Sequence, residues 1–127
     1  VAKKNDFKIV CFVAPTTTDE RMSLITQKSQ GFLYYISVVG ITGIRDRLPE
    51  DVVQNINKLK KMTTTPIAVG FGVSTPEQAK LIGRVADGVI VGSAIIKEIE
   101  KYSNESSERL VNKVGEFVGQ LIEGAKG

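Results

Sequence analysis

The sequence predicts an α/β fold in which four βα units follow one another along the chain. Two observations support this prediction: apolar runs of strand length alternate with segments of helical periodicity, and glycines follow directly after three of the runs. The runs are continuous rather than alternating, as in strands that are buried on both faces. This order of elements indicates a parallel sheet in which each helix is a crossover connection.

The first two units can be placed from their apolar patterns. Residues 8–13 form a continuous apolar run, and a helix is expected to open at residues 18–20 and extend toward Gln30. Residues 32–39 are a second run rich in aromatic and β-branched residues, followed by a loop at 40–48 and a helix that begins near Pro49. The apolar face of that helix has i, i+4, i+7 spacing and consists of Val52, Ile56 and Leu59.

The third unit combines a strand at residues 66–69 with a helix at 75–84. The start of this helix carries several capping signals. They are a cap at Ser74 or Thr75, a first-turn proline at Pro76, and a residue that can close a capping box at Glu77 or Gln78.

The fourth unit has a strand at residues 88–91 and a short helix at 93–101. A last amphipathic helix follows the polar segment SNESSE at residues 103–108. The apolar stripe expected on this helix consists of Leu110, Val114, Phe117 and Leu121.

The composition excludes several kinds of site. The 127 residues include one cysteine, Cys11, and no histidine, which excludes an internal disulfide, a Cys/His metal cluster and a Ser-His-Asp triad. Carboxylates therefore remain the natural candidates for proton transfer.

The charge and hydropathy patterns indicate where the protein acts. The net charge of +3 comes from scattered lysines without interleaved aromatic residues, so nucleic-acid binding is not expected. No apolar run has the length of a membrane helix and the N-terminus lacks a signal-peptide layout. We therefore expect a cytoplasmic protein that contacts no membrane.

Two architectures accept four βα units: a complete open doubly wound sheet, or half of an eightfold βα barrel. Glycines after the strands, together with the extra short helix after the fourth strand, favour the half barrel. In such barrels the site is built at the carboxyl ends of the strands, and phosphate is commonly held there by a short helix N-terminus. The chain is accordingly interpreted as a single partial domain, residues 1–127.

Glycines after the third and fourth strands suggest a phosphate cradle. Backbone N–H groups at a glycine turn and a helix start can converge on a phosphate without any charged side chain. The alternative is that each glycine is needed only for its turn. The residues of the predicted cradle are Gly70, Gly72, Gly92 and Ser93, whose hydroxyl can add a further contact.

Other residues are candidates for an apolar pocket and a lid. Phe71 is either a core residue or a pocket wall, and the same two alternatives hold for Tyr34. The loop at 40–48 is long for a βα connection and carries Thr42 between glycines. It is either a lid over a ligand or an ordinary flexible loop.

Three motifs in the same order resemble the C-terminal half of tryptophan synthase alpha chains. They are GFLYYISVVGITG at residues 31–43, PIAVGFGVSTPEQ at 66–78 and ADGVIVGSAIIK at 86–97. The segment APTTTDERM at residues 14–22 fits the same family. The resemblance extends from about Ile9 to the C-terminus.

The resemblance implies a (β/α)8 TIM barrel that cleaves indole-3-glycerol phosphate to indole and glyceraldehyde 3-phosphate. It also implies a partner beta chain, which carries pyridoxal phosphate and receives the indole, whereas no cofactor is expected in this chain. The resemblance assigns Gly43, Gly70, Gly72, Gly92 and Ser93 to the phosphate, Tyr34 and Phe71 to the indole pocket, and Thr42 to the lid.

The two catalytic carboxylates of the family lie on earlier strands, so the resemblance places them in an N-terminal half that precedes these residues. Asp19, Asp46 and Glu77 are better explained as loop or helix-start residues. We therefore expect this chain alone to be inactive. Alternative interpretations are another phosphate-binding barrel, such as an isomerase of histidine biosynthesis, and a non-catalytic half-barrel scaffold that associates with itself.

Overall fold

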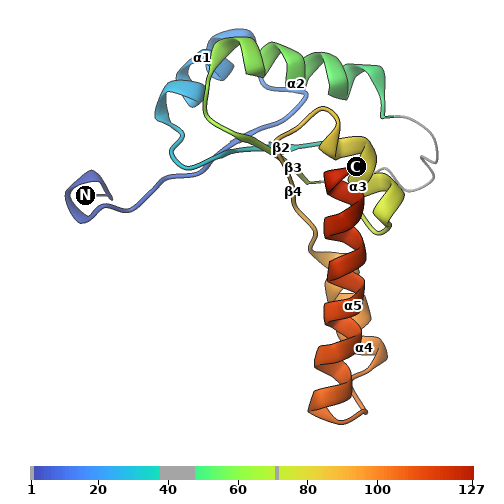
Figure 1. The fold of residues 1–127 in the computed structure, drawn as a ribbon. Coiled ribbons are helices and arrows are strands. Elements are labelled where there is room, and N and C mark those ends of the chain that lie inside the picture. Colours follow the sequence, from blue (N-terminus) through green and yellow to red (C-terminus); the bar gives the residue numbers. More distant parts are fainter. Residues whose placement is uncertain (1, 38–47, 71) are drawn as a thin grey trace.

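The computed structural model describes residues 2–37, 48–70 and 72–127. Its centre is one four-stranded parallel sheet in the order β1-β2-β3-β4 (Figure 1). The strands are β1 (Cys11–Val13), β2 (Leu33–Ile36), β3 (Ile67–Gly70) and β4 (Gly88–Val89). The helices are η1 (Ala2–Asn5), α1 (Asp19–Lys28), α2 (Glu50–Met62), α3 (Pro76–Gly83), α4 (Ser93–Lys101) and α5 (Ser107–Lys126).

The sequential strand order decides between the two predicted architectures. A doubly wound sheet reverses its strand order at a switch point and has helices on both faces. Here the four strands follow one another in chain order, and α1 and α2 lie over the same face of the sheet (Figure 1). The order and the one-sided cover fit half of a βα barrel, as the sequence analysis predicted.

The face of the sheet that is covered by helices forms the core. The register aligns Val13 with Tyr35 and Tyr35 with Val69, and these side chains are at most 1% exposed. Against them lies the predicted stripe of α2, whose members Val52, Ile56 and Leu59 are fully buried. The phenol of Tyr35 accepts a hydrogen bond from Asn55 Nδ2 at 3.2 Å, and burial raises the pKa of this phenol.

The opposite face of the sheet has no comparable cover in the described chain. Its register row consists of Phe12, Tyr34, Ala68 and Gly88. Phe12 is 56% exposed, and Tyr34, Ala68 and Gly88 are half-buried. In a closed barrel these positions face the interior, so the structure presents half of that interior to solvent.

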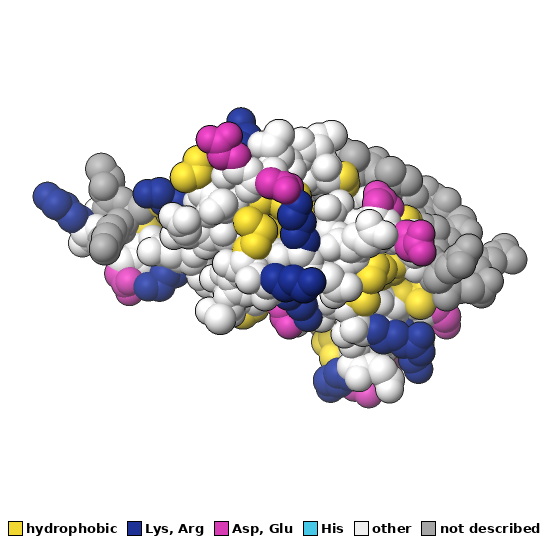
Figure 2. Space-filling view, turned by 90° about the horizontal axis from the view of Figure 1, so that it is seen from above, with side chains coloured by type: hydrophobic (Ala, Val, Ile, Leu, Met, Phe, Trp, Pro, Cys, Tyr) yellow, Lys and Arg dark blue, Asp and Glu magenta, His cyan; other side chains and the backbone are white. Residues whose placement is uncertain are grey.

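The outer, helical side of the molecule is polar and mixed in charge. Seen from above, Lys and Arg alternate with Asp and Glu, and apolar side chains appear only in small groups (Figure 2). No stripe of positive charge crosses this view, which agrees with the scattered lysines of the sequence.

The two edge strands are shorter than predicted. Of the run at 8–13 only Cys11–Val13 pairs as a strand, because the Ile9 carbonyl instead accepts a hydrogen bond from the N–H of Gln30 at 2.7 Å. Of the run at 88–91 only Gly88–Val89 is assigned to β4, although Ile90 N–H still donates to Val69 O at 2.8 Å. The end of the second predicted run, at 38–39, lies outside the described residues.

The start of α3 resolves the alternatives left by the sequence. Thr75 is the cap, because its hydroxyl accepts a hydrogen bond from Gln78 N–H at 3.3 Å. The Gln78 side chain reaches back to the N–H of Ser74 at 2.8 Å. Glu77 does not close the box; hydrogen bonds with its own backbone and with Thr75 lower the pKa of its carboxyl.

Helices α3 and α5 cross at two glycines. A Cβ added to Gly83 would lie 2.1 Å from the carbonyl oxygen of Ala125, and one added to Gly124 would lie 2.3 Å from that of Pro76. Both neighbours are backbone atoms, which cannot rotate away. The absence of two side chains therefore sets how closely α5 approaches α3.

This crossing predicts opposite effects for two similar substitutions in α5. Gly124→Ala should lower the free energy of unfolding by about 1–3 kcal/mol, since the added methyl overpacks the crossing. Gly119→Ala is the control, because nothing lies within 4 Å of its added Cβ. It should raise stability by about 0.5–1 kcal/mol through helix propensity alone. Urea unfolding followed by circular dichroism measures both, and equal effects would contradict the proposed crossing.

Candidate functional site

The carboxyl ends of β3 and β4 lie side by side. Ala68 pairs with Gly88 and Val69 with Val89, and a Cβ added to Gly70 would lie 3.0 Å from the Cβ of Ile90. The two glycine positions that follow these strands, Gly72 and Gly92, therefore lie at the same end of the sheet, the end formed by the carboxyl ends of the strands. The structure brings together the two segments that the sequence predicts to act jointly.

The second segment leads directly into the N-terminus of α4. Gly92 is the cap residue and Ser93 is the first helical residue, as predicted, and Ser93 is exposed. The N–H groups of Ile95 and Ile96 both donate to Gly92 O, at 3.0 and 3.2 Å. The N–H groups of Ser93 and Ala94 come before these bonds and have no acceptor within the helix.

The electrostatics of this helix start suit an anion. The first turn of α4 contains no acidic residue and its cap makes no side-chain hydrogen bond. By contrast, Glu50 and Asp51 occupy the first turn of α2. The partial positive charge at the N-terminus of α4 is therefore not neutralised by a carboxylate of its own first turn.

The three described glycines of the predicted cradle differ in what explains their lack of a side chain. Gly72 has φ = +65°, in the left-handed region that favours glycine, so its backbone alone requires it. Gly92 has φ = −121° and ψ = −82°, angles outside the main regions that residues with a side chain adopt, and no described atom within 4 Å of an added Cβ. No described neighbour explains its lack of a side chain.

The space that a side chain at Gly70 would need is filled by another residue of the same chain. An added Cβ would lie 2.6 Å from the hydroxyl of Tyr34 and 2.9 Å from its ring. Gly70 is buried, whereas Gly72 and Gly92 are exposed. Gly70 thus has a structural reason that needs no ligand, namely to make room for the Tyr34 ring.

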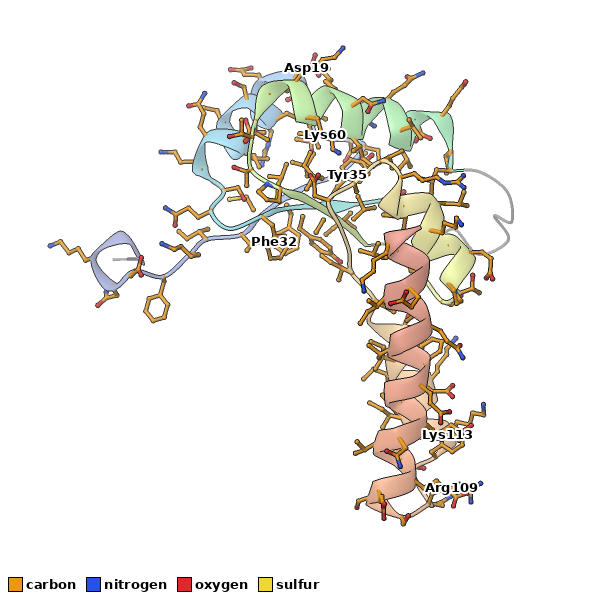
Figure 3. The ribbon with its side chains drawn as sticks, viewed as in Figure 1. Asp19, Phe32, Tyr35, Lys60, Arg109 and Lys113 are labelled. Carbon is orange, nitrogen blue, oxygen red and sulfur yellow. The ribbon has the colours of Figure 1, made fainter. Side chains whose placement is uncertain are left out.

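Tyr34 forms an aromatic wall on the uncovered face of the sheet. Its ring lies 5.0 Å from that of Phe12, with the two planes at 71° in an edge-to-face arrangement. Figure 3 shows Phe32 below the sheet, on the side away from the helical layer that carries Asp19. Tyr34 was predicted from the sequence, whereas Phe12 was not, because only the register of β1 with β2 places it beside Tyr34.

Some predicted site residues lie outside the described residues. These are Thr42 and Gly43 of the predicted lid loop, and Phe71 between the two glycines. The lid and half of the predicted indole pocket therefore remain predictions from the sequence.

The described carboxylates near the sheet have structural partners. Asp19 forms an ion pair with Lys58. Asp87 Oδ2 accepts a hydrogen bond from Ile67 N–H at 2.9 Å, while its Oδ1 lies 3.4 Å from Lys60 Nζ. Asp87 precedes β4 and Ile67 begins β3, so this pair is at the amino ends of the strands, opposite the cradle.

Two further observations on the described chain concern metal ions and membranes. No group of three or more His, Cys, Asp or Glu side chains in the described ranges is placed to hold a metal ion. Within the same ranges, no helix is both long and apolar enough to cross a bilayer. The described site offers backbone donors, a hydroxyl and aromatic rings.

Comparison with known proteins gives a consistent family. The model for the tryptophan synthase alpha chain family matches residues 1–126. The tryptophan synthase alpha chain of Dehalococcoides mccartyi is 41% identical over 120 residues, covering 94% of this chain and 45% of that protein.

Solved structures show the same relationship. Tryptophan synthase subunit alpha from Legionella pneumophila superposes with a TM-score of 0.77 at 30% identity, over 97% of this chain and 44% of that one. Tryptophan synthase from M. tuberculosis, in an open form, superposes with a TM-score of 0.80 at 26% identity, over 98% and 43%. The chain spans a little under half the length of these relatives.

The contact between Gly70 and Tyr34 predicts non-additive substitutions. Gly70→Ala should lower the free energy of unfolding by about 1–3 kcal/mol because the methyl displaces the Tyr34 ring. In a Tyr34→Ala background that ring is absent, so the same substitution should cost much less, giving a coupling of at least about 0.5 kcal/mol. Gly88→Ala, whose added Cβ would make only ordinary contacts, the nearest at 3.5 Å with Ala68, is the control and should not lower stability. Urea unfolding of the four variants measures the cycle, and additive effects would contradict the contact.

Proposed function

The chain belongs to the tryptophan synthase alpha chain family, and we propose that it is the C-terminal half of an indole-3-glycerol-phosphate lyase. In this proposal the complete barrel cleaves its substrate by a retro-aldol reaction to indole and glyceraldehyde 3-phosphate. The observation that carries the proposal is the cradle, in which the paired ends of β3 and β4 meet the acid-free N-terminus of α4. Such a helix start binds a phosphate monoester through backbone N–H groups.

The cradle residues bind the phosphate and thereby orient the rest of the substrate. We assign Ser93, through its N–H and its hydroxyl, and Gly92, through the close approach that its missing side chain permits. Gly72, and Gly43 from the loop outside the described residues, complete the cradle. Gly70 acts differently, because it places the ring of Tyr34 beside the site.

The aromatic residues hold the indole end of the substrate. Tyr34 and Phe71 line the pocket in this proposal, and Phe12 adds an edge-to-face contact that keeps the Tyr34 ring in place. Tyr34 and Gly70 lie on the same face of the sheet, so a substrate whose phosphate is at the cradle would place its apolar ring over the strands. Thr42 closes the site from the loop at 40–48.

The acid–base chemistry comes from outside this chain. A retro-aldol cleavage needs a base that removes a hydroxyl proton and an acid that protonates the departing carbon. The described carboxylates near the sheet have structural partners, so we assign both roles to a glutamate and an aspartate of the N-terminal half. A positioned general acid or base typically contributes a factor of about 10² to 10⁴ in rate.

The proposed assembly has two further components. The N-terminal half of the barrel would pair with the free edges of β1 and β4 and bring the carboxylates over the cradle. A tryptophan synthase beta chain would receive the indole and would carry the pyridoxal phosphate of the second reaction, so no cofactor is assigned to this chain. Both partners follow from the family, whose relatives are about twice as long as this chain.

The division of roles predicts complementation. This chain alone should show no measurable cleavage of indole-3-glycerol phosphate, because both carboxylates are absent. Adding the N-terminal half of the Dehalococcoides mccartyi alpha chain should restore release of indole, which a colorimetric assay detects. The same half without this chain is the control. Cleavage by this chain alone would overturn the assignment of roles.

The cradle predicts a selective loss of phosphate binding in the reassembled barrel. Gly92→Asp should weaken binding of glyceraldehyde 3-phosphate at least roughly tenfold, since a carboxylate would repel the phosphate and a lost charge-assisted bond costs about 1.5–3 kcal/mol. Aspartate is a favoured cap residue and nothing described lies within 4 Å of the added Cβ, so α4 should persist.

Two controls make this loss specific. Gly119→Asp introduces the same charge on the exposed side of α5 and should leave affinity unchanged. Free indole has no phosphate, so its binding should change little in either variant. Isothermal titration calorimetry measures the affinity of each variant for glyceraldehyde 3-phosphate and for indole. Unchanged phosphate affinity in a folded Gly92→Asp variant would place the cradle elsewhere.

A further inference from the structure

The sheet ends in two strands that each have one neighbour. The strands β1 and β4 are the outer members of the order β1-β2-β3-β4, and all described pairings are parallel. Unpaired strand edges bind other strands readily unless they are blocked. The edge strands β1 and β4 run in the same direction. Strands that close the sheet into a ring of parallel strands must therefore be parallel to both of them.

An apolar surface accompanies the β4 edge. Two adjoining cavities of about 260 Å³ each lie between β4 and α5. They share Val89, Ile122 and Ala125, and Ile122 is 48% exposed. A surface of this kind is suited to another βα element with an apolar face.

The two edges differ in side-chain size on the uncovered face. Along the register row the side chains decrease from Phe12 at β1 and Tyr34 at β2 to Ala68 at β3 and Gly88 at β4. A Cβ added to Gly88 would make only ordinary contacts, the nearest at 3.5 Å with Ala68. The β4 edge therefore has space where the β1 edge has a large, half-exposed ring.

The curvature of the sheet sets how many copies close the ring. The chain superposes over nearly its whole length on barrels about twice as long, so its four strands take up half of the turn. A two-fold axis along the barrel then places β4 of each copy beside β1 of the other. Phe12 of one copy would lie at the edge where the other has Gly88.

We propose that this chain, without an N-terminal half, forms a closed two-fold dimer in which each β1 edge pairs with the β4 edge of a second copy. A single second copy satisfies both edges at once, as closed symmetry requires. The proposal needs only the edges and the uncovered face. It does not depend on the catalytic function proposed above.

Sedimentation velocity of the wild-type chain tests the proposal directly. The expected species has twice the 13.8 kDa mass of one chain. A compact monomer at tens of micromolar would overturn the proposal, and so would an open series of polymers, because the ring would not be closed.

Variants with matched exposure locate the interface. Phe12 and Leu24 are each 56% exposed, but Phe12 belongs to the row on the uncovered face of the sheet, whereas Leu24 lies on α1, in the helical layer that covers the other face. Phe12→Lys should raise the dissociation constant of the dimer at least roughly tenfold, whereas Leu24→Lys should not change it. Gly88→Leu, which fills the space at the other edge, should act like Phe12→Lys. Equal effects of Phe12→Lys and Leu24→Lys would overturn the proposed edges, with circular dichroism showing that each variant is folded.

Complementation separates this proposal from the proposed function. An N-terminal half should compete with the second copy, so adding it should convert dimers into active one-to-one barrels. A monomeric chain that is still complemented would remove the dimer and leave the function standing. A dimer that no N-terminal half activates would support the dimer and remove the function.

Discussion

The packing of α2 against the sheet is the contact on which the rest of the structure depends. Three side chains of α2 with no exposed surface lie against strand residues at most 1% exposed, and Asn55 satisfies the one buried phenol among them. This layer holds β2 beside β3, and β3 in turn pairs with β4. The position of the predicted cradle at the ends of β3 and β4 therefore follows from apolar packing that lies outside the cradle itself.

One-sided packing also leaves one face of the sheet open. Because the helices cover only one face, Phe12, Tyr34, Ala68 and Gly88 remain without a covering layer. In a barrel the interior is filled by side chains from strands all around the ring. One-sided packing thus leaves the inner face open and gives β1 and β4 one described neighbour each, which is the basis of both assemblies proposed above.

Local features were predictable from the sequence. Contacts between a glycine and a residue far from it along the chain were not. The bounds of α4, the apolar stripe of α2 and the capping of α3 follow from periodicity and from residues within four positions of one another. The contact of Gly70 with Tyr34, or of Gly124 with Pro76, depends on how closely two elements approach in space. Phe12 was missed for a similar reason, because its place beside Tyr34 requires the register between β1 and β2. The predicted edge strands were too long because a strand with one neighbour has fewer partners than its apolar run suggests.

The glycines of the site show what a structure adds to a motif. From the sequence Gly70, Gly72 and Gly92 are equivalent, and each can be either a turn or part of a phosphate cradle. In the structure Gly70 is explained by a ring from its own chain and Gly72 by its left-handed backbone. Gly92 has neither explanation, and it caps a helix whose first turn lacks a carboxylate. The open space around Gly92 leaves room for a group that approaches from outside the chain, as the proposed phosphate would. Gly92 and Ser93 therefore support the proposed phosphate site more strongly than the number of glycines in the motif does.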